Sequence, residues 1–192
     1  MKNLNNTASI LDAIAKVKNW QNDMTPGEGH KVLEKINGSW NEDISISIDS
    51  DLPATKNTAT AEAKMILNGL YQQIEHKGSI NEMPYEAMSL MGFDNAKKLY
   101  TLIWADNLGS DMMQLTGRWD EITESINFEG SFPDPFLGNK IGVRIIMHFS
   151  DGNAPVIEMY ETIYNRERQT MKMKLSKKEH AATNAIETSL AG

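Results

Sequence analysis

Short alternating segments separated by turn residues are the feature of this sequence that most constrains its fold. Ile44, Ile46 and Ile48 alternate with serines, which is the pattern of a strand with one buried face. About ten such segments follow between Trp40 and Leu175, at spacings of roughly 8–14 residues, with clusters of Asn, Asp, Gly and Pro between them. No intervening stretch is long enough for a helical crossover, so the sheet should be antiparallel. Because closure removes the edges of a sheet, the sequence predicts a mainly β protein with a single antiparallel up-and-down β-barrel.

A helical arm and a second helical segment precede the predicted barrel. Ser9 is a suitable helix cap, and the apolar residues from Ile10 to Val17 recur at helical spacing. A second helical pattern begins near Pro26 and stops at Asn37. We expect the helical arm to pack on its own domain. The alternative is that the arm contacts a partner or a second subunit.

The chain divides into three predicted parts. These are the helical arm over residues 1–25, the barrel domain over residues 26–175, and a polar tail over residues 176–192. The tail is rich in small residues and is expected to be a frayed or weakly helical extension. A length of 192 residues suits one domain with short extensions.

The composition excludes several classes of function. The chain has no Cys, which excludes a disulfide scaffold, a thiolate metal site and a cysteine nucleophile. A net charge of −7 argues against nucleic-acid binding, which needs clustered Lys and Arg. The first apolar stretch is interrupted by Asp12 and Lys16, so it is neither a signal peptide nor a membrane span. A cytoplasmic location is therefore expected.

Several short motifs resemble those of one family. The strongest is Trp104-Ala105-Asp106-Asn107-Leu108-Gly109. The others are Glu28-Gly29-His30-Lys31-Val32-Leu33, Gly38-Ser39-Trp40, Met91-Gly92-Phe93-Asp94-Asn95, Asp134-Pro135, Arg144 and Glu158-Met159-Tyr160. In this order they resemble DUF1579, a family of uncharacterised bacterial proteins, over Pro26 to Leu175. The sequence departs from the family at Asn68, where a glycine is usual, and at Lys172, where an acidic residue is usual. The resemblance implies a lipocalin-like (calycin) barrel more directly than it implies a function.

Positional parity predicts which side chains face the barrel lumen, because strand residues alternate between interior and exterior. Trp40 and Glu42 share one face of the first strand, and Trp40 is expected to plug the closed end of the barrel. Tyr100, Trp104 and Asp106 share one face of a central strand. These three are expected to face the lumen.

Two strands near the C-terminus carry polar residues at alternate positions. Arg144 and His148 share one face of the segment 142–149, and Glu158 and Tyr160 share one face of the next strand. Such a pattern is typical of a solvated outer face. A buried Arg, however, needs an acidic partner, because a lone buried charge is costly. Since the resemblance also falls on Arg144 and Glu158, we expect them to share the lumen face, to pair, and to orient a ligand.

No cofactor or metal is predicted. The four His are scattered, without the spacing of a zinc site. A haem held by His148 or His76 is the alternative that remains open. No Gly-X-Ser-X-Gly elbow and no Gly-rich phosphate loop is present, so no catalytic residue is predicted.

Three functions remain open. The first is a protein that binds a small apolar or amphipathic molecule in the lumen, with methionines forming an adaptable wall rather than an ordinary filled core. The second is an enzyme that uses Asp106, Glu158 or His148 as acid or base. The third is a structural or interaction protein with a filled lumen, which forms a homodimer through the arm or a sheet face. The predicted lumen residues are Trp40, Tyr100, Trp104, Asp106, Arg144, His148, Glu158 and Tyr160.

Overall fold

Ten antiparallel strands form one closed barrel, in which each strand pairs with its neighbours in sequence and β1 pairs with β10. The computed structural model describes residues 3–49, 51–133, 140–149 and 154–178. The strands are β1 (Gly38–Ile46), β2 (Thr55–Ile66), β3 (Tyr71–Ile80), β4 (Met83–Asp94), β5 (Leu99–Asp106), β6 (Met113–Asp120), β7 (Ser125–Pro133), β8 (Lys140–His148), β9 (Val156–Ile163) and β10 (Arg166–Lys177). The predicted mainly β, up-and-down antiparallel barrel is confirmed.

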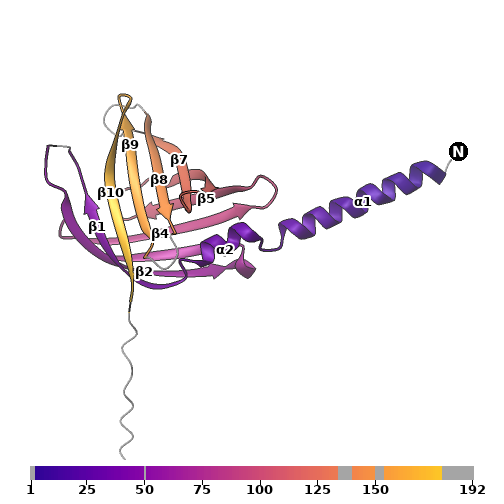
Figure 1. Cartoon of the computed structure of the whole chain (residues 1–192), viewed down its shortest axis with the longest axis horizontal. Coiled ribbons are helices and arrows are strands. Elements are labelled where there is room, and N and C mark those ends of the chain that lie inside the picture. Colours follow the sequence, from indigo (N-terminus) through magenta and orange to yellow (C-terminus); the bar gives the residue numbers. More distant parts are fainter. Residues whose placement is uncertain (1–2, 50, 134–139, 150–153, 179–192) are drawn as a thin grey trace, which may run out of the picture.

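The strands of the barrel run in two general directions. In Figure 1, β8, β9 and β10 stand upright, whereas β2 and β4 lie across the view. Sharp turns join several of the strands. Asn81 and Glu82 have φ angles of 49° and 67° between β3 and β4, and Tyr164 and Asn165 have φ angles of 49° and 61° between β9 and β10. Two consecutive residues with positive φ match the twist of the strands that they join.

The first strand ends earlier than its sequence pattern predicts. Alternation continues to Ile48, but β1 stops at Ile46, and Ile48 is 63% exposed. Its partner strand begins only at Thr55, opposite Ile46. The chain leaves its pairing with β2 at this point, although the backbone N–H of Ser47 still donates to the carbonyl of Thr170 on β10 at 2.9 Å.

The short helix α2 (Glu28–Glu34) covers one end of the barrel. Leu33 and Ile36 are both fully buried there. Trp40 is 4% exposed and its Nε1 donates to the carbonyl of Ile36 at 2.6 Å. On the opposite side of the end, the hydroxyl of Tyr100 donates to the carbonyl of Gly29 at 3.2 Å. These contacts close this end of the lumen.

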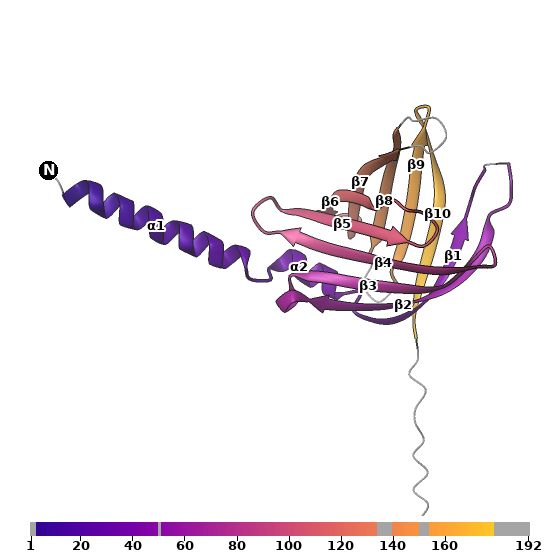
Figure 2. The same cartoon turned by 180° about the vertical axis from the view of Figure 1, so that it is seen from behind.

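The longer helix α1 (Asn3–Asp23) extends away from the barrel, as Figures 1 and 2 show from opposite sides. It begins before Ser9, so the predicted cap at that position is wrong. Its anchor is at its C-terminal end, where the Asn95 amide donates to the carbonyls of Asn22 and Thr25 at 3.2 and 2.9 Å. The expectation that the arm packs on its own domain is wrong. Its large apolar side chains are 52–64% exposed: Ile10, Leu11, Ile14, Val17 and Trp20.

Part of the predicted C-terminal tail belongs to the barrel, because β10 continues to Lys177. The predicted fraying or helicity of residues 179–192 lies outside the described residues. The predicted turns at Asp134-Pro135 and at Asp151-Gly152-Asn153 also lie outside them.

Candidate functional site

The barrel encloses a cavity of about 820 Å³. This volume lies in the range of protein pockets that hold small organic molecules. The cavity reaches from the middle of the lumen to the loop between β5 and β6, where Leu108, Gly109, Ser110 and Asp111 line it. It therefore opens at the end opposite α2. Most of its wall is apolar: Ile74, Ile80, Met91, Leu102, Met113, Phe132, Ile145, Met147, Ile157, Met159, Met171 and Met173.

Methionines make up half of that apolar wall, because six of them occupy inward positions on five strands of the barrel. Three other strand-region methionines, Met83, Met88 and Met112, are instead 48–74% exposed. Methionine is unbranched and adapts to irregular shapes. The interior methionines thus form a deformable lining, and the hypothesis of a filled lumen is wrong.

One side of the lumen is polar and is built on β1 and β3. The Nδ1 of His76 lies 2.9 Å from Oε1 of Glu42, and the two side chains are 2% and 0% exposed. In the strand register, Trp40 lies opposite Ala61 of β2, and Ala61 lies opposite His76. Because Ala61 has only a methyl group, side chains from β1 and β3 meet above β2. Small residues on β2 therefore make room for the Glu42–His76 pair.

The polar side continues onto β5 through aromatic and hydrogen-bond contacts. The rings of His76 and Trp104 have centroids 4.8 Å apart and are tilted by 41°. The Trp104 Nε1 donates to Oδ2 of Asp106 at 3.0 Å, and Oδ1 of Asp106 accepts from the backbone N–H of Leu108 at 2.9 Å. Both carboxylate oxygens of Asp106 are therefore fixed in position. We refer to Glu42, His76, Trp104 and Asp106 together as the polar corner.

Two atoms of the polar corner are buried without a hydrogen-bond partner: Oε2 of Glu42 and Nε2 of His76. Nearby, Tyr85 is 4% exposed and lines the same cavity. Burial raises the pKa of its hydroxyl, and the carboxylates of Asp106 and Glu42 raise it further. At the mouth, burial raises the pKa of Glu161, while Arg168 and Thr170 act in the opposite direction. Negative groups thus dominate the electrostatics of the lumen.

One family matches the chain over residues 25–177: a protein family of unknown function, DUF1579. The chain belongs to the DUF1579 family. The resemblance to DUF1579 that the motifs around Trp104 indicate is therefore confirmed. No curated protein matches the chain. The function of this DUF1579 protein must accordingly be argued from its own cavity.

Two of the eight predicted site residues line the cavity of the DUF1579 protein, and two others lie deeper. Trp104 and Asp106 face the lumen as their parity predicts. Tyr100 is 1% exposed and packs beside α2, where burial raises its pKa to about 12. Trp40 lies at the same closed end, as expected of a plug. Tyr100 and Trp40 therefore shape the closed end and do not line the cavity.

The remaining four residues lie on the outer face, so their predicted lumen position is wrong. On β8 the alternate residues from Ile141 to Met147 are buried, which turns Arg144 and His148 outward. On β9 the alternate residues line the cavity, which turns Glu158 and Tyr160 outward. Parity grouped the residues of each strand correctly. It assigned the polar group to the lumen, whereas the structure places the apolar group there. Facing the apolar members inward removes more apolar surface from water and leaves the charges hydrated.

The outer-face residues form ion pairs with other residues on the outer surface of the barrel, so the predicted Arg144–Glu158 pair is not formed. Arg144 pairs with Glu167 at 2.7 Å and lies over the ring of Tyr160, 4.3 Å from its centroid. Glu158 pairs with Lys172 at 2.7 Å. The hydrogen bond from Lys172 lowers the pKa of the Glu158 carboxyl. This cluster belongs to the outer surface of β8, β9 and β10.

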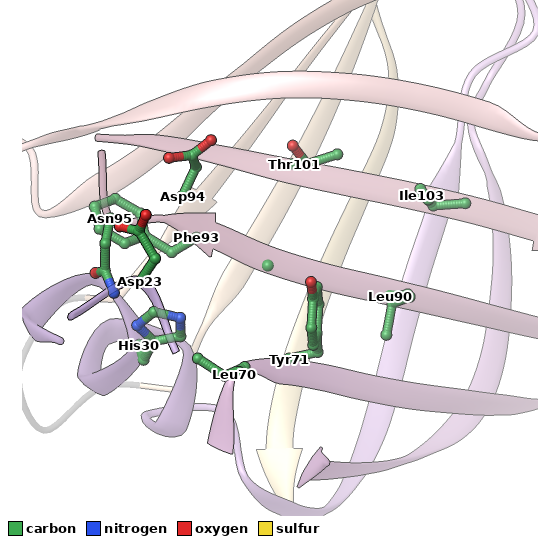
Figure 3. A pocket seen from close by; sticks show the side chains of 11 residues that line it. Asp23, His30, Leu70, Tyr71, Leu90, Phe93, Asp94, Asn95, Thr101 and Ile103 are labelled. Carbon is green, nitrogen blue, oxygen red and sulfur yellow. The ribbon is translucent and has the colours of Figure 1, made fainter. Parts of the chain in front are cut away.

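A second hollow, of about 400 Å³, lies outside the barrel beside α2 (Figure 3). His30 borders it from the helix, and Tyr71, Leu90 and Ile103 border it from the strands. The Nδ1 of His30 accepts from the backbone N–H of Gly27 at 2.9 Å, and burial lowers the pKa of the ring. His30 therefore helps to fix the start of α2. This hollow is half the volume of the lumen cavity, which remains the stronger site.

No group of three or more His, Asp or Glu that could hold a metal ion occurs among the described residues. The alternative of a bound haem predicted His148 or His76 as its ligand. His76 lines the lumen, whereas His148 lies on the outer face of β8, so a haem hypothesis now depends on His76. A visible absorption spectrum of the purified protein tests it. In the described part of the chain, no helix has the length and apolar character needed to cross a membrane.

The sequence prediction missed the Glu42–His76 pair. Parity placed Glu42 on the same face as Trp40, which is an inward position for a charged residue. Such a position requires a buried partner. This requirement indicates that Glu42 has a buried partner. That partner, His76, lies two strands away, so no local sequence pattern identifies it.

Proposed function

We propose that the protein binds a small apolar or amphipathic molecule in the lumen of its barrel. The observation that carries the proposal is the 820 Å³ cavity with an apolar, methionine-rich wall and one polar corner. Apolar walls supply the affinity of such sites, and a few fixed polar groups supply orientation. Since α2 and Trp40 close the other end, the entrance that the described residues show lies at the loop between β5 and β6.

The uncharged dye N-phenyl-1-naphthylamine provides the test. We expect saturable binding of one dye per chain, with energy transfer from Trp104 to the bound dye. Met159→Trp adds bulk inside the lumen and should weaken binding roughly tenfold or more, which corresponds to about 1.4 kcal/mol. Fluorescence titration measures both effects.

Two outer-face variants are the controls. Met88→Trp makes the same substitution at a side chain that is 48% exposed, and its affinity should stay within about twofold of wild type. Arg144→Leu removes an exposed ion pair and should cost about 1 kcal/mol of stability or less, with dye binding retained. Equal loss of affinity in the inner and outer variants would contradict binding in the lumen.

A second candidate function is catalysis in the same lumen. A carboxylate that holds one ring nitrogen of a His, as Glu42 holds His76, is an arrangement that orients a general acid or base. Of the acid–base candidates named from sequence, only Asp106 lines the cavity; Glu158 and His148 face outward. Recovery of a chemically altered ligand after incubation with the protein would favour catalysis over binding.

We further propose that α1 joins two copies of the chain as a homodimer. Ile10, Ile14, Val17 and Gln21 follow spacings of four, three and four residues, which place them along one seam of the helix, and Met24 follows directly after its end. Asp12 and Lys16 form an ion pair within the helix at 2.8 Å, away from this seam. The seam carries no charge, which suits an identical helix better than a nucleic acid or an anionic membrane surface.

Analytical ultracentrifugation of the full chain tests the homodimer. Ile14→Asp places a charge on the seam and should weaken self-association roughly tenfold or more. Because Ile14 is 58% exposed, the fold of the barrel should be unaffected. Asn19→Asp introduces the same charge on the opposite helix face and should leave the dimer intact. A wild-type chain that sediments as a monomer would refute the proposal.

The cytoplasmic location of the protein remains a prediction.

A further inference from the structure

The titratable groups that line the lumen are almost all acidic. Asp106, Asp111 and Glu161 line the cavity, and Glu42 lies directly behind His76. In the part of the chain that the structure describes, no Lys or Arg lines the cavity. The chain contains 19 Lys and Arg, so their exclusion from the wall does not follow from composition. A ligand therefore enters a cavity with negative potential.

The acidic groups differ in how their charge is compensated. At the mouth, Glu161 lies opposite Arg168 in the strand register, and the charge of Arg168 acts on it. The guanidinium of Arg168 also donates to the carbonyl of Ile48. Asp106 instead accepts only from the neutral donors Trp104 Nε1 and Leu108 N–H. No ion pair with a Lys or Arg compensates Asp106 among the described residues.

His76 adds a hydrogen-bond acceptor beside this carboxylate. When Nδ1–H donates to the Glu42 carboxylate, the Nε2 of the neutral ring carries a lone pair. That Nε2 is buried and has no partner, and the ring contacts Trp104, whose indole donates to Asp106. A group that donates hydrogen bonds and carries positive charge satisfies both His76 and Asp106. The faces of Trp104 and Tyr85 would also attract a cation.

We infer that the lumen selects an amphipathic molecule with a protonated amine head group, whose apolar body lies against the methionine wall. The inference depends on the proposed binding function and specifies its ligand class. A carboxylate head group would lie beside Asp106 and near Glu42, and it would offer no proton to His76. Like charges and unpaired acceptors in a desolvated site discriminate strongly against such a ligand.

Three unbranched ligands of ten carbon atoms test the inference: decylamine, 1-decanol and decanoate, each titrated at pH 7 against bound N-phenyl-1-naphthylamine. Decylamine should displace the dye at the lowest concentration, and decanoate should bind roughly tenfold or more weakly than decylamine. Asp106→Asn keeps one acceptor oxygen but removes the charge. It should reduce the preference for decylamine over 1-decanol to within about threefold while the affinity for 1-decanol is retained.

Glu158→Gln is the matched control, because it removes a carboxylate from the outer face. It should leave the order of the three ligands unchanged. If the dye and 1-decanol bind but decanoate binds as tightly as decylamine, the head-group inference is wrong while lumen binding stands. If neither the dye nor any of the three ligands binds, the proposed function itself fails. Should Asp106→Asn not fold, the wild-type order of the three affinities still decides.

Discussion

His76→Leu is expected to lower the free energy of unfolding by about 3–5 kcal/mol, because it leaves the Glu42 carboxylate buried without its partner. Glu42 is 1% exposed, and its second oxygen already has no hydrogen bond. Chemical denaturation of the variant measures the loss.

The companion variants distinguish the loss of the buried Glu42–His76 contact from a general packing defect. Glu42→Leu leaves a His76 ring that can remain neutral, so it should cost about 1–3 kcal/mol, less than His76→Leu. The double variant Glu42→Leu/His76→Leu removes both polar groups and should be more stable than His76→Leu alone, since apolar replacements of buried pairs are often tolerated. A double variant whose loss equals the sum of the two single losses would show that the pair is not coupled.

Trp40→Ala is expected to cost about 3–5 kcal/mol, the usual range for removing a buried Trp side chain. Trp40 is 4% exposed, donates to the Ile36 carbonyl at 2.6 Å, and has the Lys177 ammonium 4.0 Å above its ring. Truncation should therefore loosen both α2 and the contact between β1 and β10. Thermal or chemical unfolding, followed by circular dichroism, measures the change.

Trp40→Phe provides the graded comparison. It retains an aromatic plug but loses the indole donor, so the buried Ile36 carbonyl becomes unpaired at a cost of about 1–3 kcal/mol. Since Trp40 does not line the cavity, dye affinity of the folded Trp40→Phe variant should match wild type. A selective loss of dye affinity at unchanged stability would mean that Trp40 contacts the ligand.

The barrel could be predicted from sequence because its signals are local. Alternating residues such as Ile44, Ser45 and Ile46 define strands, and turn residues such as Asn68-Gly69 separate them. At that turn Asn68 and Gly69 have φ angles of 58° and 82°, which these two residue types adopt readily. Strand ends were less predictable, because β1 ends where β2 begins rather than where its own alternation stops.

The candidate site was only partly predictable. Parity placed Trp104 and Asp106 in the lumen, but Glu158 was predicted as the acidic partner of Arg144 because it lies one hairpin away along the chain. Glu167 on β10 is instead that partner, at the surface. The Glu42–His76 pair required the registers of three strands at once, which alternation within single strands does not contain.

The order of the strands also bears on how the chain folds. Nine of the ten strand pairings join neighbours along the sequence, and only the pairing of β1 with β10 joins opposite ends of the barrel. Hairpins form within microseconds, whereas a contact such as Trp40 opposite Lys177 must first close a very long loop. We therefore expect the hairpins to form early and the pairing of β1 with β10, which closes the barrel, to be the slow step of folding.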